Sequence, residues 1–85
     1  MVIKEVIWTQ KFEDELKKVK DTAIKERTKK QIEKIIKNPE VGKPLRFKLK
    51  GERTVYIKPY RLIYSVIGDK LYLLRFEHRK KVYRI

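Results

Sequence analysis

The sequence has no cysteine, a single histidine, a single serine and only three glycines among its 85 residues. Without cysteine the chain has no disulfides, no thiolate zinc site and no cysteine nucleophile. One histidine and the isolated carboxylates of the second half form no ligand cluster, so we expect no metal. The scattered glycines match no phosphate-binding or dinucleotide-binding motif, and Ser65 lies in no nucleophile-elbow motif. These absences argue against most hydrolase and nucleotide-binding classes, and we expect no cofactor.

Long hydrophobic runs are also absent. The longest stretch without a charged residue, 62–68, is far shorter than the ~18 residues of a membrane-spanning helix. Lys4 and Glu5 interrupt the only early apolar stretch, so no secretory signal is predicted. We therefore expect a cytoplasmic protein with no membrane association.

Positive charge is what the sequence has in excess, with 24 Lys and Arg against 11 Asp and Glu and a formal net charge of +13. Residues 1–42 carry 11 basic and 8 acidic side chains, a net +3, whereas residues 43–85 carry 13 and 3, a net +10. In the lysine-rich surface of a thermophilic protein, the number of glutamates rises together with the number of lysines. The second half of this chain is rich in lysine and arginine without a matching number of acidic residues. The asymmetry predicts a cationic surface for RNA or another anionic partner.

The first half reads as a strand followed by two helices, within one domain spanning 1–85. The β-branched, apolar run at 2–8 predicts the strand. Thr9 is a candidate N-cap for the first helix, and Asp21 or Thr22 for the second. The second helix should end at the Asn38-Pro39 breaker. The apolar stripe of the first helix is Phe12, Leu16 and Val19.

The second half changes to a period of two. Apolar and basic residues alternate over 45–50, which predicts a strand with one apolar and one basic face. After a turn at Gly51, strands are predicted around 55–57, over 60–67 and over 71–78, the last two joined by a two-residue turn. Residues 79–85 form a basic tail.

This order predicts an α+β fold, in which an N-terminal strand and a two-helix hairpin pack on one face of a small, mainly antiparallel four-stranded sheet. The opposite face stays open, and the alternate basic residues of the strands project from it. The candidate RNA-binding residues are Arg46, Lys48, Lys50, Arg53, Lys80 and Lys81.

The remaining side chains with useful chemistry are arginine, lysine, tyrosine and the single histidine. They suit phosphodiester cleavage in which the RNA 2′-hydroxyl is the nucleophile, because that reaction needs alignment, charge stabilisation and proton transfer. Arg61 and Arg79 are candidates for the phosphoryl oxygens, and Tyr83 for stacking on a base. The alternatives are solvated arginines and a core tyrosine. His78 is either a structural hydrogen-bonding group or a proton-transfer group.

Several short segments occur in an order and spacing typical of one family. They are 8–12 (WTQKF), 36–39 (IKNP), 42–45 (GKPL), 49–51 (LKG), 60–64 (YRLIY) and 78–83 (HRKKVY). Over essentially its whole length, the chain resembles the RelE/ParE superfamily of toxins from prokaryotic toxin–antitoxin pairs. The fold implied by this resemblance agrees with the one predicted above.

The resemblance implies functional roles. RelE-like members bind the ribosomal A site and cleave mRNA there without a metal, using basic residues and a C-terminal tyrosine. By position, Arg61 would contact the phosphate, Arg79 would act in transition-state or leaving-group chemistry, and Tyr83 would stack on the substrate. His78 falls where relatives have a basic residue or histidine. The implied partners are a cognate antitoxin and the ribosome, through its rRNA and the A-site mRNA.

One stretch departs from the RelE-like pattern, which commonly has two alternating basic residues on the strand before the Tyr-Arg motif. Residues 54–58 (TVYIK) offer only Lys58, in a shifted register, as a proton carrier. ParE-like relatives instead poison DNA gyrase as protein binders without ribonuclease activity. The expectation is a ribosome-dependent endoribonuclease toxin, with a gyrase inhibitor or a catalytically degenerate RNA-binding relative as alternatives.

Overall fold

The computed structural model describes residues 2–45 and 51–82, without the side chains of residues 81 and 82. Its centre is a mixed five-stranded sheet of order β1-β5-β4-β3-β2, in which β1 runs parallel to β5 and the other neighbours are antiparallel. The strands are β1 (Glu5–Trp8), β2 (Lys43–Pro44), β3 (Glu52–Ile57), β4 (Tyr60–Ile67) and β5 (Lys70–His78).

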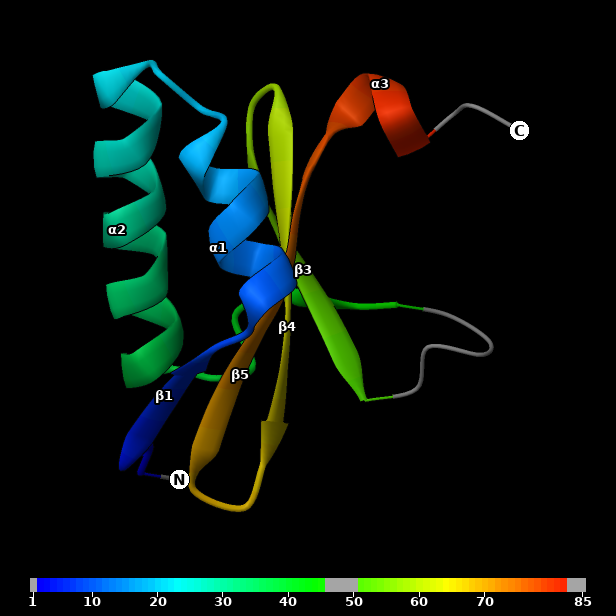
Figure 1. Ribbon diagram of the computed structural model, residues 1–85. Helices are drawn as coiled ribbons and strands as arrows, with labels where there is room; N and C mark the ends of the chain where they lie inside the picture. The colour runs from blue at the N-terminus through cyan, green and yellow to red at the C-terminus, as the bar shows by residue number, and fades with distance from the viewer. Residues whose placement is uncertain (1, 46–50, 83–85) are drawn as a thin grey trace.

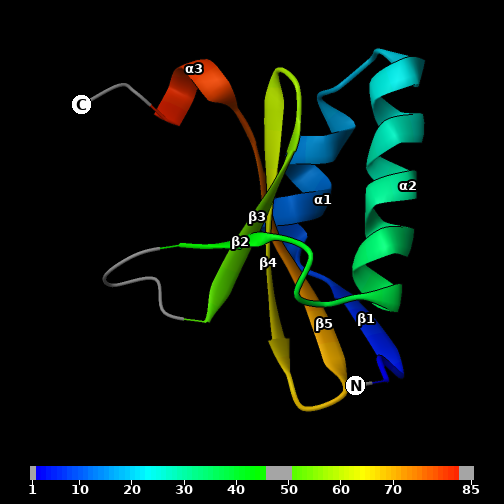
Figure 2. The ribbon, with the colours of Figure 1, turned by 180° about the vertical axis from the view of Figure 1, so that it is seen from behind.

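Two helices, α1 (Gln10–Lys17) and α2 (Thr22–Lys37), cover one face of this sheet (Figure 1). A short helix, α3 (Arg79–Val82), extends from the other side (Figures 1 and 2). The predicted α+β fold with both helices on one face is confirmed. The sheet has five strands instead of four, because β1 pairs in parallel with β5 and so joins the sheet as an edge strand.

Side-chain caps set the start of each long helix. The Thr9 hydroxyl accepts from the Phe12 N–H at 3.3 Å and donates to the Leu73 carbonyl at 2.7 Å, so it also ties α1 to β5. The Asp21 carboxylate accepts from the Ala23 and Ile24 N–H groups, which identifies Asp21, not Thr22, as the cap of α2. These bonds satisfy N–H groups that have no partner within the helix.

The hydrophobic core lies between the helices and the sheet. Phe12 of α1 is fully buried, and its ring meets that of Phe76 edge-on at a centroid distance of 6.0 Å. The other fully buried apolar residues of this core are Ile35, Leu62, Leu71 and Leu73. Apolar residues from α1, α2, β4 and β5 therefore meet in one layer, as the two sequence periods require.

A buried tyrosine fastens the loop after α2 to the sheet. The Tyr64 hydroxyl donates to the Pro39 carbonyl at 2.7 Å and accepts from the Gly42 N–H at 2.9 Å. A Cβ atom at Gly42 would lie 2.7 Å from that hydroxyl, so the close approach requires glycine. Burial raises the pKa of Tyr64, while the Gly42 hydrogen bond and the nearby Arg53 charge act in the opposite direction. The loop is thereby held where Lys43–Pro44 can pair with β3.

The predicted strand over 45–50 lies almost wholly outside the described residues, with only Leu45 inside them. The predicted strand over 60–67 is confirmed, and the one over 71–78 begins one residue earlier. In the described part of the chain, no helix combines the length and the apolar character needed to cross a membrane.

Candidate functional site

The sheet face opposite the helices carries Arg61, the strand arginine predicted from the sequence. Leu62 and Phe76 face the core, so their neighbours Arg61 and Glu77 project from the opposite face. Arg61 pairs in register with Glu77 on β5 and with Tyr56 on β3. We call this side of the sheet the open face.

On the open face, Arg61 is engaged by a carboxylate. Its Nε and Nη2 groups both donate to Glu77 Oε1 at 3.3 Å. Each side chain of this pair is 20% exposed. The guanidinium keeps further N–H donors, since arginine has five, and the partial exposure leaves the pair within reach of a ligand.

The pair extends into a chain of alternating charges. Glu77 Oε2 lies 3.9 Å from Arg75 Nη1, and Arg75 Nη2 donates to Glu52 Oε1 at 3.1 Å. Arg75 on β5 thus spans β4 to reach β3. We call Arg61, Glu77, Arg75 and Glu52 the charge network; its formal charge is zero. The expectation of a basic open face is therefore modified, because both arginines there are balanced by glutamates.

Two side chains are buried close to the charge network. Ile63 is fully buried opposite Arg75 in the register, and it lies on the face away from the main core. Thr54, which is opposite Ile63, is 4% exposed. Within the described residues, its hydroxyl has no hydrogen-bond partner. The floor of the open face is thus apolar apart from this hydroxyl.

His78 lies on the other side of the sheet from Arg61. Its ring meets Tyr60 edge-on at 5.1 Å, and Tyr60 in turn stacks on Phe76. With Glu15 and Lys18 of the α1 region, these rings line a hollow of about 230 Å³. His78 Nδ1 accepts from the Lys80 N–H at 3.1 Å. The sheet separates the imidazole from Arg61, so these two predicted site residues are not brought together.

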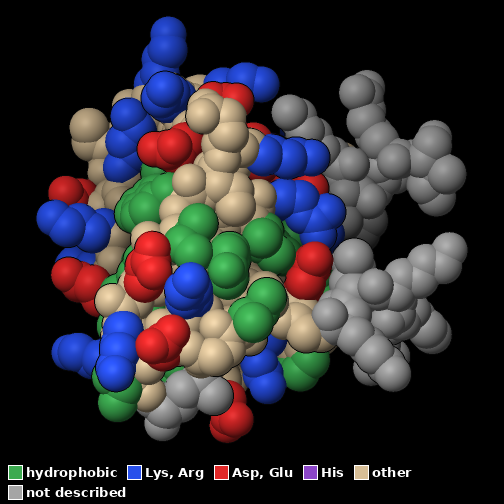
Figure 3. Space-filling model, turned by 60° about the horizontal axis from the view of Figure 1, so that its bottom comes forward, with side chains coloured by type: hydrophobic (Ala, Val, Ile, Leu, Met, Phe, Trp, Pro, Cys, Tyr) green, Lys and Arg blue, Asp and Glu red, His purple; other side chains and the backbone are tan. Residues whose placement is uncertain are grey.

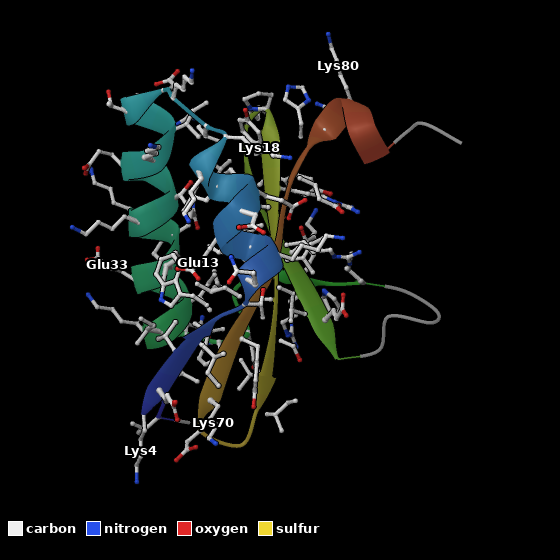
Figure 4. The ribbon with its side chains drawn as sticks, viewed as in Figure 1. Lys4, Glu13, Lys18, Glu33, Lys70 and Lys80 are labelled. Atoms are coloured by element: carbon white, nitrogen blue, oxygen red, sulfur yellow. The ribbon has the colours of Figure 1, made fainter. Side chains whose placement is uncertain are left out.

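Exposed cations lie together where β3 turns into β4 and where α3 begins. The Arg79 N–H donates to the Pro59 carbonyl at 2.7 Å, which ties α3 to that turn. Lys58 in the turn and the side chains of Arg79 and Lys80 are exposed. Lys80 projects from α3, at the opposite end of the molecule from Lys70 (Figure 4). Arg61 follows the turn directly, so this end combines Arg61, Arg79, Lys58 and Lys80.

Arg53 has a different position. Its Nη1 group donates to the Gly42 carbonyl at 2.8 Å and to the Glu40 carbonyl at 3.4 Å, so it holds the loop before β2. The remaining predicted site residues lie outside the part of the chain that the structure describes. These are Arg46, Lys48, Lys50 and Tyr83, together with the side chain of Lys81.

The opposite end of the molecule has a mixed surface. Figure 3, seen from that end, shows hydrophobic side chains gathered among side chains of both charges. Val2 and Ile67 are 70% and 65% exposed, and Trp8 is also exposed. Away from this end, on the helical side, Trp8 and Leu16 border a hollow of about 260 Å³ with Glu13, Lys17 and Lys25.

Sequence reasoning missed the acidic members of the charge network and Tyr56. Glu77 was detectable, because alternation from the apolar Phe76 puts it on the face of Arg61. The Arg75–Glu52 contact was not detectable from the sequence, because it depends on an irregularity in the β4–β5 register between Ile63 and Tyr64.

The fold and sequence match one family of known proteins. Residues 6–83 match the model of the ParE toxin of the type II toxin–antitoxin system parDE. No curated protein matches the chain significantly. A chain of the toxin–antitoxin complex RelBE2 from Mycobacterium tuberculosis is 28% identical at a TM-score of 0.77, with 93% of this chain and 94% of that one covered.

Two further solved structures share the fold. A chain of the RelB–RelE antitoxin–toxin complex from Methanococcus jannaschii is 24% identical with a TM-score of 0.70, covering 91% of this chain and 94% of that chain. A chain of the E. coli DinJ–YafQ toxin–antitoxin complex is 18% identical with a TM-score of 0.74, covering 98% and 100%. With its family match over residues 6–83, the chain belongs to the ParE toxin family of type II toxin–antitoxin systems, within the RelE/ParE superfamily.

Proposed function

We propose that this toxin inhibits translation by cleaving mRNA on the ribosome without a metal ion. The observation that carries the proposal is the end of the molecule that combines Arg61 on the open face with the exposed Arg79, Lys58 and Lys80. Phosphodiester cleavage through the 2′-hydroxyl needs positive charge around phosphorus more than it needs a nucleophile from the protein. A guanidinium on a sheet with exposed cations beside it suits that requirement.

Each candidate has a role in the proposed reaction. Arg61 would hold a non-bridging phosphate oxygen, and Arg79 would stabilise the charge that develops on the pentavalent phosphorus or the leaving oxygen. Tyr83 would stack on a base. Lys58 is favoured over His78 for moving the proton, because the sheet lies between His78 and Arg61 while Lys58 is exposed in the adjoining turn.

We further propose two macromolecular partners: the ribosome, with its rRNA and A-site mRNA, and a cognate antitoxin. Relatives of this chain were crystallised as toxin–antitoxin complexes, which supports the antitoxin. The net charge of +13 favours an acidic or amphipathic antitoxin segment, because complementary charge speeds association and disfavours wrong partners.

The proposal is tested in a translation extract to which purified toxin is added. Primer extension should reveal mRNA cut at the ribosomal A site, and Arg79→Ala should abolish the cut. Lys70→Ala is the matched control, because it removes one positive charge from an exposed site at the other end of the molecule and should keep the activity. Intact message in the presence of a toxin that still arrests growth would refute cleavage.

A gyrase inhibitor is the second candidate. The matched family model is named for ParE, and the stretch before Tyr60 lacks an alternating basic pair. This candidate predicts altered plasmid supercoiling by gyrase together with normal translation in the extract. If induction of the gene leaves growth unchanged, the degenerate RNA-binding alternative is favoured over both.

A further inference from the structure

Tyr56 is a large aromatic side chain that the fold leaves uncovered. It lies on β3 between Val55 and Ile57, which are both buried in the core, so strand alternation turns the phenol toward the open face. Tyr56 is 56% exposed to solvent. Among the described residues, the phenol has no hydrogen-bond partner and no ring within aromatic contact. Tyr56 therefore contributes little to holding this fold together.

The sheet register places Tyr56 directly opposite Arg61. Side chains opposite each other on one face of an antiparallel pair have Cβ atoms about 4.5–5.5 Å apart. An exposed π-surface thus lies next to a guanidinium that still has free donors. The aromatic ring offers stacking to any base, and the guanidinium offers paired donors to a phosphate.

We propose that Tyr56 stacks on a nucleobase and forms, with Arg61, a site for one nucleotide of single-stranded RNA. The base lies on the phenol ring while an adjoining phosphate binds the Arg61 guanidinium. This site deepens the proposed function and rests on it, since RNA is the substrate there. Stacking on aromatic side chains is how proteins hold bases that are not paired in a duplex.

The geometry gives the two side chains separate tasks. Arg61 neutralises charge and so acts on any polyanion, whereas Tyr56 carries no charge and acts only on a partner that has bases. A polyanion without bases therefore distinguishes the two contributions. Heparin is such a probe, because it presents sulfate and carboxylate groups but no aromatic ring.

The test measures binding of the full-length protein to a mixed-sequence RNA dodecamer and to heparin at one fixed ionic strength. Tyr56→Ala should weaken RNA binding by roughly 5- to 150-fold, the range expected for the loss of one stacked base, and leave heparin binding unchanged. Tyr56→Phe and Tyr56→Trp should bind RNA within about threefold of the wild type, because they keep the ring. Arg61→Ala should weaken both ligands.

Further controls distinguish the loss of stacking from the loss of an apolar side chain and from a loss of folding. Tyr56→Leu keeps an apolar side chain without a π-face and should lose RNA affinity as Tyr56→Ala does. Ile67→Ala removes another exposed apolar side chain on the neighbouring strand, far from Arg61, and should change neither ligand. Thermal unfolding of each variant should give a midpoint close to that of the wild type.

The outcomes are distinct. Equal losses for RNA and heparin, or wild-type RNA affinity of Tyr56→Ala, would overturn the stacking site. Selective loss of RNA affinity in a toxin that cuts no mRNA would support the site and refute the cleavage proposal. Failure of the wild type to bind the RNA dodecamer would overturn the stacking site, whereas cleavage on the ribosome is decided by the translation extract.

Discussion

The two faces of the sheet bury neighbouring residues in different ways. Leu62 and Ile63 are adjacent on β4 and both are fully buried. Leu62 lies under the helices in the apolar core, whereas Ile63 lies on the open face beside the charge network. Water does not compete for apolar contacts. An anion that reaches the arginine, in contrast, can compete with the carboxylate for the guanidinium group. The helical face thus stabilises the fold, and the open face remains available for function.

The largest effect is expected on the helical face. Phe12→Ala removes a fully buried ring that contacts both Trp8 and Phe76, so it leaves a cavity between α1 and β5. We expect a loss of about 3–5 kcal/mol in the free energy of unfolding, measured by urea denaturation. Because a domain of this size has little stability to lose, the variant should be largely unfolded at 37 °C. A loss below about 1 kcal/mol would contradict the central place of α1 in the core.

An intermediate effect is expected at the junction between the loop after α2 and the sheet. Tyr64→Phe removes the hydroxyl that bonds to Pro39 and Gly42, and it leaves both backbone groups without that partner. We expect a loss of about 1–3 kcal/mol in urea denaturation at neutral pH.

The same tyrosine makes a pH-dependent prediction. Because the folded-state pKa of Tyr64 is raised above the ordinary value of 10.0, its contribution to stability is fully present below pH 10. Above that pH the unfolded chain loses the phenolic proton first, so stability falls as pH rises toward the folded pKa. The difference in unfolding free energy between wild type and Tyr64→Phe should therefore shrink at alkaline pH. A difference that stays constant from pH 8 to pH 11 would contradict the assignment.

The smallest effect on stability is expected on the open face. Glu77→Gln removes the charge that pairs with Arg61 and Arg75, and a partly exposed pair of this kind contributes about 1 kcal/mol or less. The same change should tighten heparin binding several-fold at low salt, since both guanidinium groups lose their anionic competitor. Glu33→Gln on the exposed surface of α2 is the control with the same change in net charge (Figure 4). If both variants tighten heparin binding equally, net charge alone explains the effect and the comparison between the two faces fails.

Local patterns in the sequence predicted the elements well, because the interactions that start and end them are local. The Thr9 and Asp21 caps, the end of α2 before Asn38-Pro39 and the strand Tyr60–Ile67 all depend on residues a few positions apart. The period of two also put Arg61 on the open face correctly. Alternation alone was sufficient there, since the core side of β4 is marked by Leu62.

Those local patterns could not predict contacts between residues that are far apart in the sequence. The sequence did not indicate that β1 would pair in parallel with β5, or that Glu52 would reach Arg75 across β4. The sequence suggests His78 as a site residue through its residue type and its place in the segment 78–83, but the strand alternation that separates Glu77 from His78 turns its ring toward Tyr60 on the helix side. A count of charges likewise could not show that Arg61 and Arg75 each have a glutamate partner.

The amino-acid sequence was sufficient to predict the order of the elements, the packing of both helices on one side of the sheet, the excess of positive charge and the residue types available for chemistry. These follow from composition and from periodicities of two and 3.6 residues, which any chain segment expresses locally. The three-dimensional structure was needed to show which cations are neutralised, which face His78 occupies and which side chain lies beside Arg61. Those outcomes depend on strand order and register, because the sheet brings together residues such as Tyr56, Arg61 and Glu77 from three different strands.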